Sequence, residues 1–336
     1  MNETISTPIL SEILDSLDWE GLKYMVAKTA LELDLFSIIS QGHHTLESIS
    51  VATQCHERGM RILLDALCPL GLLNKSGSEY TLAPVAEMFL VRGKPAYCAD
   101  AYLTWWQNRN RMIENLKTGT ASLDLSGPDV GEFWANYTAQ DLITWPQIAE
   151  KARQSWKTMG IDRETRPGLR ILDVASGSGA KSFVLAQDDP DAHVTVLDLP
   201  QVLEVSAQIA KAMGVAQQVS FLPSNMMTIR LPSNQFDIVF FGAILYYFNP
   251  DQVKAVLHNA HNALCPNGLV VIGTLVADEE RCRSEMALLG AVELFNIAPH
   301  SHVYSFSEYK GFLEATGFSE VRCHTETKIS AMKLQG

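Results

Sequence analysis

Residues 171–182, Ile-Leu-Asp-Val-Ala-Ser-Gly-Ser-Gly-Ala-Lys-Ser, read as a short buried strand that leads through a glycine-rich turn into a helix. The two glycines, Gly177 and Gly179, allow a ligand to approach the backbone closely. A dinucleotide-binding fingerprint would need a third glycine at position 182, where the chain has Ser182. The glycine pair therefore predicts a ligand-binding turn and leaves the ligand open.

Short β-branched runs alternate with helical segments from Leu169 onward. The runs lie at residues 170–174, 193–198, 219–222, 236–241 and 269–273. This alternation predicts an α/β fold, a doubly wound and mostly parallel sheet with helices on both faces. Such sheets bind ligands at the carboxyl ends of their strands. We therefore expect the chemistry at the edge of the sheet that carries the glycine-rich turn.

Two acidic residues narrow the choice of ligand. Asp173 ends the first strand beside the turn, where a carboxylate would repel a pyrophosphate and attract a cation. Asp198 ends the second strand, about 20 residues after the turn, where a carboxylate can accept hydrogen bonds from ribose hydroxyls. S-adenosylmethionine has a ribose, a sulfonium and an ammonium, and no phosphate. The two carboxylates therefore predict S-adenosylmethionine as the cofactor.

The first part of the chain has a different pattern. Apolar residues recur at three- and four-residue spacing from Ser11 to about Val91, which predicts helices. Two apolar runs flank an Asn-Lys-Ser-Gly turn within residues 71–82, which predicts a β-hairpin and, after the helices, a winged helix. We predict a winged-helix-like dimerisation domain over 1–100, a helical linker over 101–165 that contributes to the substrate pocket, and a cofactor-binding catalytic domain over 166–336.

The linker is rich in tryptophan. Most of these rings are expected to pack in the core, and one or two to line a pocket for a flat ligand. The stretch Thr118–Gly131, which contains glycine, proline and several Ser and Thr residues, is predicted to be a loop. The tryptophans are Trp105, Trp106, Trp134, Trp145 and Trp156.

Composition excludes several classes of function. A hydrophobic fraction of 47% with 19% charged residues is typical of a globule and excludes general disorder. The net charge of -12 disfavours nucleic acid and anionic lipid as partners. The winged helix would suit a DNA-binding regulator, but residues 1–100 carry seven basic and thirteen acidic residues, and only Arg58 and Arg61 could begin a basic stripe. We expect no nucleic-acid partner.

The remaining sequence signals concern compartment and metals. The six cysteines are dispersed without zinc spacing, so we expect reduced thiols and no metal site. The N-terminus lacks the basic start and apolar block of a signal peptide, which predicts a cytoplasmic protein. The most apolar stretch, residues 238–248, is far shorter than the roughly 20 residues of a membrane-spanning helix. We expect no membrane partner.

Three further motifs carry a resemblance to a known family. Residues 196–202 read Val-Leu-Asp-Leu-Pro-Gln-Val, residues 33–36 read Leu-Asp-Leu-Phe, and residues 80–84 read Tyr-Thr-Leu-Ala-Pro. Together with the glycine-rich turn, they resemble the S-adenosylmethionine-dependent small-molecule O-methyltransferases of plants and bacteria, across nearly the whole chain. The resemblance implies a homodimer formed through the winged-helix region. It also implies methylation of a small aromatic or polyketide-like acceptor, most often on oxygen.

The resemblance also implies roles for individual residues in cofactor binding. The methionine end would be held at the turn, the ribose by Asp198, and the adenine beside Leu199. The family usually has Gly-Asp-Met-Phe where this chain has Ser-Asn-Met-Met, and the amide oxygen of Asn225 can still accept the hydrogen bond of the adenine amino group. The implied cofactor-binding residues are Asp173, Gly177, Gly179, Asp198, Leu199, Asn225 and Met226.

The catalytic pattern of the family is absent. Tyr246 stands where the family has a histidine base, and Thr274 and roughly Val303 stand at the two flanking glutamate positions. A tyrosine with a pKa of about 10 is a poor base at neutral pH. The catalytic candidates are Tyr246, His300 and His302.

Several explanations stay open. Tyr246 could orient an acceptor that is already ionised, or the loop histidines His300 and His302 could act as base. The acceptor could be carbon, because Ile-Leu-Tyr at 244–246 resembles the bacteriochlorophyllide C-methyltransferase. A cofactor-binding homologue that catalyses a reaction other than methylation is the third alternative.

Overall fold

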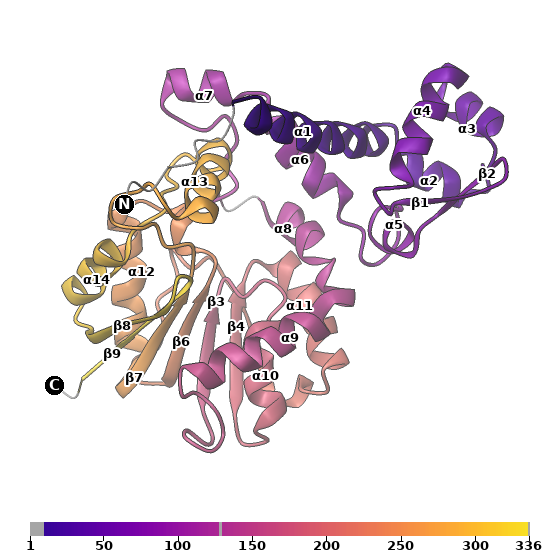
Figure 1. Ribbon diagram of the computed structural model, residues 1–336. Coiled ribbons are helices and arrows are strands. Elements are labelled where there is room, and N and C mark those ends of the chain that lie inside the picture. Colours follow the sequence, from indigo (N-terminus) through magenta and orange to yellow (C-terminus); the bar gives the residue numbers. More distant parts are fainter. Residues whose placement is uncertain (1–9, 128–129, 335–336) are drawn as a thin grey trace, which may run out of the picture. The chain divides into compact units, whose positions relative to one another are not determined.

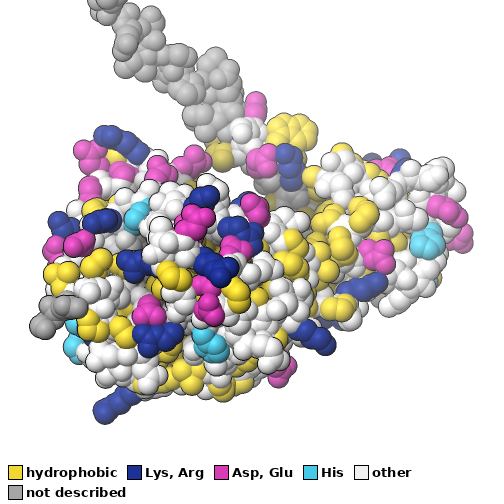
Figure 2. Space-filling view, turned by 90° about the horizontal axis from the view of Figure 1, so that it is seen from below, with side chains coloured by type: hydrophobic (Ala, Val, Ile, Leu, Met, Phe, Trp, Pro, Cys, Tyr) yellow, Lys and Arg dark blue, Asp and Glu magenta, His cyan; other side chains and the backbone are white. Residues whose placement is uncertain are grey.

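The computed structural model describes residues 10–127 and 130–334. The chain divides between Trp106 and Gln107 into two compact units, a smaller N-terminal and a larger C-terminal one (Figure 1). Figure 2 shows that Lys and Arg side chains on the face it presents are interspersed with Asp and Glu. Ion pairs such as Arg153–Asp188 and Arg170–Asp237, at 2.8 Å each, link elements of the larger unit.

The smaller unit consists of helices and one hairpin, as predicted. The hairpin strands pair antiparallel from Leu73 opposite Leu82 to Ser76 opposite Glu79, within the predicted residues 71–82. The elements in chain order are α1 Leu10–Glu32, α2 Leu35–Ser40, α3 Leu46–Thr53, α4 Glu57–Leu67, β1 Leu73–Ser76, β2 Glu79–Leu82 and α5 Pro84–Phe89, and α6 Ala99–Arg109 crosses the boundary.

The Leu-Asp-Leu-Phe motif begins α2. Asp34 has a positive φ of 49°, which an aspartate tolerates, and its carboxylate accepts a hydrogen bond of 2.7 Å from the Ser37 hydroxyl. The following Leu35 and Phe36 are fully buried in the core of this unit. Tyr80 of β2 is buried as well and donates a 2.8 Å hydrogen bond to Asp65 of α4. The motif residues therefore hold helix and hairpin in one core.

The larger unit is built on a seven-stranded sheet with the order β5-β4-β3-β6-β7-β9-β8. The five strands β5 to β7 in that order are parallel, and β9 pairs antiparallel with both β7 and β8. The predicted α/β fold with a mostly parallel sheet is thus confirmed. The strands are β3 Arg170–Val174, β4 His193–Asp198, β5 Val219–Pro223, β6 Phe236–Gly242, β7 Leu264–Gly273, β8 Ser319–Thr325 and β9 Lys328–Met332.

The sequence pattern did not predict the C-terminal hairpin β8–β9. Four of the seven β8 residues are exposed at the edge of the sheet, so the apolar alternation that marks a strand is weak there. β7 begins at Leu264, five residues before the predicted run, because Leu264 pairs with Phe236 of β6. The register then shifts between Phe236 and Ile238. Both differences reflect pairing with distant strands.

Helices cover both faces of the sheet (Figure 1). α9, α10 and α11 pack on one face, with contacts among themselves and to β4 and β5, and α12 and α14 pack on the other. The helical elements are α7 Met112–Thr118, α8 Gly131–Thr138, α9 Asp141–Thr158, α10 Ala180–Asp188, α11 Pro200–Ala212, η1 Ala216–Gln218, η2 Leu245–Tyr247, α12 Pro250–Ala263, α13 Glu285–Ile297 and α14 Phe306–Ala315.

The predicted loop lies between α7 and α8. Residues 119–127 and 130 contain no helix or strand, while residues 128 and 129 of the prediction lie outside the described residues. None of the six cysteines forms a disulfide bond with a described residue. Within the described ranges we find no helix that combines the length and the hydropathy needed to cross a bilayer, and no cluster of three metal-ligating side chains.

Candidate active site

The glycine-rich turn leads from the carboxyl end of β3 into α10. Ala175, Gly177 and Gly179 all have positive φ angles, of 53°, 56° and 72°. A Cβ atom at Gly179 would collide with the ring of Phe183, whereas a Cβ at Gly177 would meet no atom within 4 Å. Gly179 is therefore required by the packing of α10. Gly177 leaves open space next to the backbone.

Asp198 joins this turn to the end of β4. Its Oδ2 accepts a 2.8 Å hydrogen bond from the Gly177 N–H, and its Oδ1 accepts a 2.7 Å hydrogen bond from the Leu199 N–H. Burial raises the pKa of Asp198 to about 6, while these two backbone donors act in the opposite direction. The carboxylate is thus held in one orientation at the mouth of the turn.

Asp173 is buried beneath the turn. Its Oδ2 accepts a 2.6 Å hydrogen bond from the Ser182 hydroxyl, and its Oδ1 has no hydrogen-bond partner among the described residues. Burial raises the pKa of Asp173 to about 8, against the opposing effects of Ser182 and the Lys181 charge. The nearby Ser176 hydroxyl is also buried and without a partner. Because buried polar atoms are normally paired, these two orphaned groups fit a ligand that brings a cation and a hydrogen-bond partner.

A cleft lies beside Asp198, between the ends of the strands and the loop before α8. Its walls bring together four of the predicted cofactor-binding residues, since Asp198, Leu199, Asn225 and Met226 all line it. Trp134 of α8 is the tryptophan on this wall, and its indole N–H donates a 3.0 Å hydrogen bond to the Leu125 carbonyl. The cleft is therefore bounded by polar groups from β4 and by an aromatic ring from α8.

Asn225 lies in the turn after β5. Its Oδ1 accepts a 2.8 Å hydrogen bond from the Met227 N–H, which fixes the amide in place. An amide oxygen can accept a second hydrogen bond, so the predicted contact with an adenine amino group is compatible with this geometry. Asp173, Gly177 and Gly179 do not line this cleft but adjoin it through the Gly177–Asp198 hydrogen bond.

Tyr246 lies in η2, directly after β6. Burial alone raises the pKa of Tyr246 to about 12, with no contribution from a hydrogen bond to a described residue. Its ring centroid is 5.1 Å from that of Tyr247, which is 5.7 Å from the ring of Trp134. Tyr246 is therefore even less basic than a solvated tyrosine, and it belongs to an aromatic cluster that extends to the cofactor cleft.

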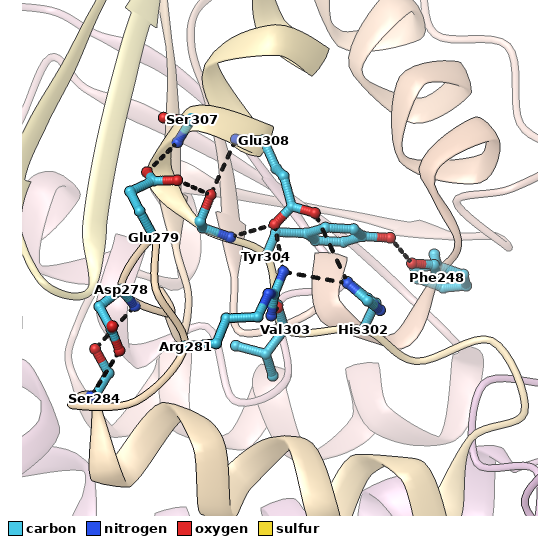
Figure 3. Close-up of polar contacts among 11 residues, drawn as sticks. Phe248, Asp278, Glu279, Arg281, Ser284, His302, Val303, Tyr304, Ser307 and Glu308 are labelled. Atoms are coloured by element: carbon cyan, nitrogen blue, oxygen red, sulfur yellow. Dashed lines mark hydrogen bonds and ion pairs between the residues drawn. The ribbon is translucent and has the colours of Figure 1, made fainter.

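The two loop histidines lie between α13 and α14. The backbone N–H of His302 donates a 2.8 Å hydrogen bond to the carbonyl of Tyr246. The His302 imidazole points toward Arg281 and Glu308 (Figure 3). Its Nε2 lies 3.5 Å from the Arg281 Nη2 and 3.9 Å from a Glu308 oxygen. Because arginine can only donate, Nε2 accepts in this contact. His300 is exposed.

Figure 3 shows how the same loop supports η2. Arg281 donates to the Val303 carbonyl at 2.8 Å and to the Glu308 carboxylate at 2.6 Å. The buried Tyr304 donates a 2.7 Å hydrogen bond to the Phe248 carbonyl. These contacts, with the His302 backbone, fix the position of residues 246–248. The loop thus acts on Tyr246 through the main chain.

The positions of the family's two glutamates hold no acid here. Thr274 is buried and shares a 2.9 Å hydrogen bond with the hydroxyl of Tyr309. Val303 is buried as well. These two positions contribute packing and one neutral hydrogen bond, so they supply no carboxylate to the aromatic cluster.

Glu293 is a candidate site residue that the sequence did not predict. Its Oε2 accepts a 2.8 Å hydrogen bond from Arg109 Nε, and its Oε1 is buried without a partner among the described residues. Burial raises the pKa of Tyr247, with smaller contributions from Tyr246, Tyr137 and the charge of Glu293, so the carboxylate lies close enough to the aromatic cluster to act on it. The only available signal was one acidic residue within the apolar run of α13. No motif marks it, because its partners come from other elements.

The order of the strands and the position of the glycine-rich turn define the class of fold. A mostly parallel seven-stranded sheet with β9 inserted between β7 and β8, a glycine-rich turn after β3 and a carboxylate at the end of β4 form a class I methyltransferase fold. The orphaned Asp173 oxygen and the oriented Asp198 fit the ammonium and ribose of S-adenosylmethionine.

Comparison with known proteins leads to the family. The family model of the O-methyltransferase domain matches residues 161–319, and that of the O-methyltransferase dimerisation domain matches residues 21–92. The tetracenomycin polyketide synthesis 8-O-methyltransferase of Streptomyces glaucescens is 28% identical, over 88% of this chain and 87% of that protein. The L-tyrosine C(3)-methyltransferase of Streptomyces lavendulae is 24% identical, over 90% of this chain and 87% of that protein.

A solved structure has the same fold. Human N-acetylserotonin methyltransferase in complex with S-adenosylmethionine matches 100% of this chain and 100% of its own, with a TM-score of 0.73 at 15% identity. The two matched domains cover about two thirds of the chain, and the chain belongs to the family of O-methyltransferases with a dimerisation domain. It is an S-adenosylmethionine-dependent methyltransferase, and the predicted cofactor is confirmed.

Cofactor binding is expected to strengthen as the pH rises from about 6 to about 8. The pKa values of Asp198 and Asp173 are raised to about 6 and about 8. In their predicted roles, both carboxylates are ionised, Asp198 to accept hydrogen bonds from the ribose and Asp173 to pair with the ammonium. In the unfolded chain both carboxyl groups have the ordinary pKa of 3.8 and are ionised in this pH range. In the unliganded folded protein their raised pKa values let them keep a proton at the same pH. Unliganded stability therefore falls as the pH rises through this window, and stabilisation by the cofactor grows.

Calorimetric titration at several pH values, in buffers of different ionisation enthalpy, measures this coupling. Binding near neutral pH should release up to about one proton from Asp173. A dissociation constant that is independent of pH, together with no proton release, would contradict the assignment of the two carboxylates.

Proposed function

We propose that the enzyme transfers the methyl group of S-adenosylmethionine to a hydroxyl oxygen of a small aromatic or polyketide-like acceptor, as a homodimer. The observation that carries this proposal is the aromatic cluster beside the cofactor cleft. Trp134 lines the cleft, and its ring lies 5.7 Å from Tyr247 and 5.8 Å from Tyr137. Flat rings stack well on such side chains. The Streptomyces relative named for polyketide O-methylation supports the same acceptor class.

Several parts of the chain are assigned roles in this proposal. The winged-helix-like domain of residues 1–100 forms the dimer, residues 101–165 contribute α8 to the acceptor pocket, and residues 166–336 bind the cofactor. The match to a dimerisation domain supports the first assignment, as does the row of exposed apolar side chains on α1. That row consists of Leu14, Leu17, Trp19, Leu22 and Met25. The cytoplasmic location stays a prediction from the sequence.

The cofactor supplies an electrophilic methyl carbon bonded to a sulfonium. In the proposed reaction the acceptor oxygen forms a bond to that carbon as the carbon–sulfur bond breaks, and the acceptor proton leaves. Asp173 pairs with the ammonium of the cofactor and Asp198 orients its ribose. The N–H of His302 holds the backbone carbonyl of Tyr246, and the Tyr246 hydroxyl donates a hydrogen bond to the acceptor oxygen. Alignment of this kind supplies a large part of the rate.

The proton requires an acceptor group, and we assign this role to Glu293. Its Oε1 is buried, unpartnered and close to the aromatic cluster, whereas Arg109 holds its Oε2. The His302 imidazole is turned to Arg281, which favours a positioning role for this residue. His300 and His302 remain the alternative bases.

A carbon acceptor is the second candidate function. The specific observation is Tyr246 in the place of the family's histidine. When a phenol or enol attacks through carbon, the carbon–methyl bond forms as the carbon–sulfur bond breaks, and a proton of the phenol or enol is lost to a base that need not lie at the position of that histidine. The L-tyrosine C(3)-methyltransferase among the relatives supports this candidate.

Product analysis tests these candidates. The enzyme is incubated with methyl-labelled S-adenosylmethionine and a panel of phenols, hydroxylated polycyclic ketones and enolisable carbonyl compounds. We expect a mass gain of one methyl group, with the carbon chemical shift of a methoxy group. A carbon-bound methyl would favour the second candidate.

Replacement of Tyr246 by phenylalanine is expected to lower kcat about tenfold while the dissociation constant of S-adenosylmethionine stays unchanged, because one hydrogen bond to the acceptor is lost. Steady-state kinetics and calorimetry measure the two quantities. Tyr80→Phe, which removes a buried hydroxyl in the smaller unit, is the matched control. An unaltered kcat would exclude the proposed role of the Tyr246 hydroxyl.

A further inference from the structure

A second cavity lies apart from the cofactor cleft. It has a volume of about 560 Å³ and lies between α9 and the β8–β9 hairpin, with Phe240 of β6 in its lining. Cavities of about 300–1,000 Å³ are typical of small-molecule sites. None of its lining residues is shared with the cofactor cleft. Its lining is therefore distinct from that of the cofactor cleft, although the charge of Lys181 also acts on Asp173 beneath the glycine-rich turn.

Three lysines line this cavity. Lys328 lies at the start of β9 and Lys181 in the first turn of α10, neither forms an ion pair with a described residue, and Lys151 is an exposed residue of α9. The Lys328 ammonium lies 5.7 Å from the centroid of the Phe240 ring. Burial, followed by the charge of Lys181, lowers the pKa of Lys328 to about 8. The charge of Lys181 also acts on Asp173 and Asp141, so Lys328 is the partly buried cation of this cavity that lacks an acidic partner among the described residues.

The position of Lys328 depends on a glycine in the neighbouring strand. Lys328 pairs with Gly273 in the β7–β9 register. A Cβ atom at Gly273 would lie 2.6 Å from the Lys328 Nζ and 3.5 Å from the Phe240 ring. The ammonium therefore occupies the space of the missing side chain, and the sheet itself directs it toward Phe240.

Aromatic and apolar groups form the rest of the wall. Trp156 is buried, its ring lies 5.0 Å from that of Phe240, and its indole N–H donates a 2.6 Å hydrogen bond to the Lys181 carbonyl. Ile148 of α9 and Met159, which directly follows α9, add apolar surface. A ligand that matches these walls has a flat apolar body and a negatively charged group.

We propose that this cavity is a binding site for a small aromatic anion, such as an aromatic carboxylate or sulfonate. The anionic group pairs with Lys328 and Lys181, and the ring packs on Phe240 and Trp156. An anion supplies the charged partner that Lys328 lacks among the described residues, and burial of the ring against the apolar walls stabilises the complex.

Two fluorescent probes that differ in charge test this site. The first, 8-anilinonaphthalene-1-sulfonate, is an aromatic anion, and the second, N-phenyl-1-naphthylamine, lacks the sulfonate. Each is titrated into the full chain in the presence of saturating S-adenosylhomocysteine, which occupies the cofactor cleft. We expect Lys328→Gln to raise the dissociation constant of the sulfonate about tenfold and to change that of the neutral probe less than about twofold, because only one charge-assisted contact is removed.

Lys254→Gln is the matched control, since this lysine lies on α12 and pairs with the exposed Asp251. It should leave the affinity for both probes unchanged. Where Lys328→Gln lowers the melting temperature, Lys181→Gln serves as the second variant and should weaken sulfonate binding in the same way. The proposal is wrong if the wild type does not bind the sulfonate, or if neither lysine variant weakens its binding.

Discussion

Replacement of Asp198 by alanine is expected to raise the dissociation constant of S-adenosylmethionine by about 10- to 100-fold, because charge-assisted hydrogen bonds of about 1.5–3 kcal/mol are lost. The carboxylate has one role that the structure shows and one that we propose. It accepts hydrogen bonds from the N–H groups of Gly177 and Leu199, which connect the glycine-rich turn to β4. In the proposed bound state it also accepts hydrogen bonds from the ribose. Calorimetric titration with S-adenosylmethionine and with S-adenosylhomocysteine measures the loss for both ligands.

The conservative variant Asp198→Asn separates shape from charge. An amide presents one oxygen and one NH2 group, so it can accept only one of the two backbone hydrogen bonds that the carboxylate accepts. We therefore expect a loss close to that of the alanine variant. Asp237→Asn provides the control, because Asp237 accepts similar hydrogen bonds from Arg170 within the same sheet but lies outside the cleft. Cofactor binding by folded Asp198→Ala with the affinity of the wild type would contradict the assignment.

The parts of the site that could be predicted from the sequence are those that depend on local pattern. Residues 170–174 and 193–198 have β-branched and apolar side chains in short runs, and the structure has strands with the same bounds. The carboxyl ends of parallel strands meet at one edge. Asp198 ends β4 and Asn225 follows the end of β5, so the two residues could be expected in one cleft. Both line the cleft in the structure.

The remaining parts depend on contacts between distant segments. Glu293 interacts with Arg109, 184 residues earlier, and no spacing within α13 indicates this pair. The backbone hydrogen bond from His302 to Tyr246 likewise forms only when the loop before α14 folds over η2. The cavity beside Lys328 depends on Gly273, whose role appears only in the β7–β9 register. Periodicity and motifs contain no information on such pairs.

Replacement of Glu293 by glutamine is expected to lower kcat about 100-fold near neutral pH, at an unchanged dissociation constant of S-adenosylmethionine, since general bases contribute about 10²–10⁴ to the rate. The amide retains the shape of the side chain and an oxygen for Arg109, so the position of α13 is preserved. What the variant loses is the ability of the buried Oε1 to take the acceptor proton. Glu285→Gln, an exposed glutamate in the first turn of the same helix, is the matched control.

The pH dependence of this deficit separates a base from a residue that only orients the acceptor. With an acceptor found in the product screen, kcat of Glu293→Gln should rise with pH as a growing fraction of the acceptor ionises in solution, and the deficit should shrink. A group that orients the acceptor without taking its proton would leave a deficit of the same size at every pH. A kcat equal to that of the wild type would remove Glu293 from the reaction and leave His300 and His302 as the bases to be replaced next. The test therefore distinguishes the buried carboxylate of α13 from the loop that holds Tyr246.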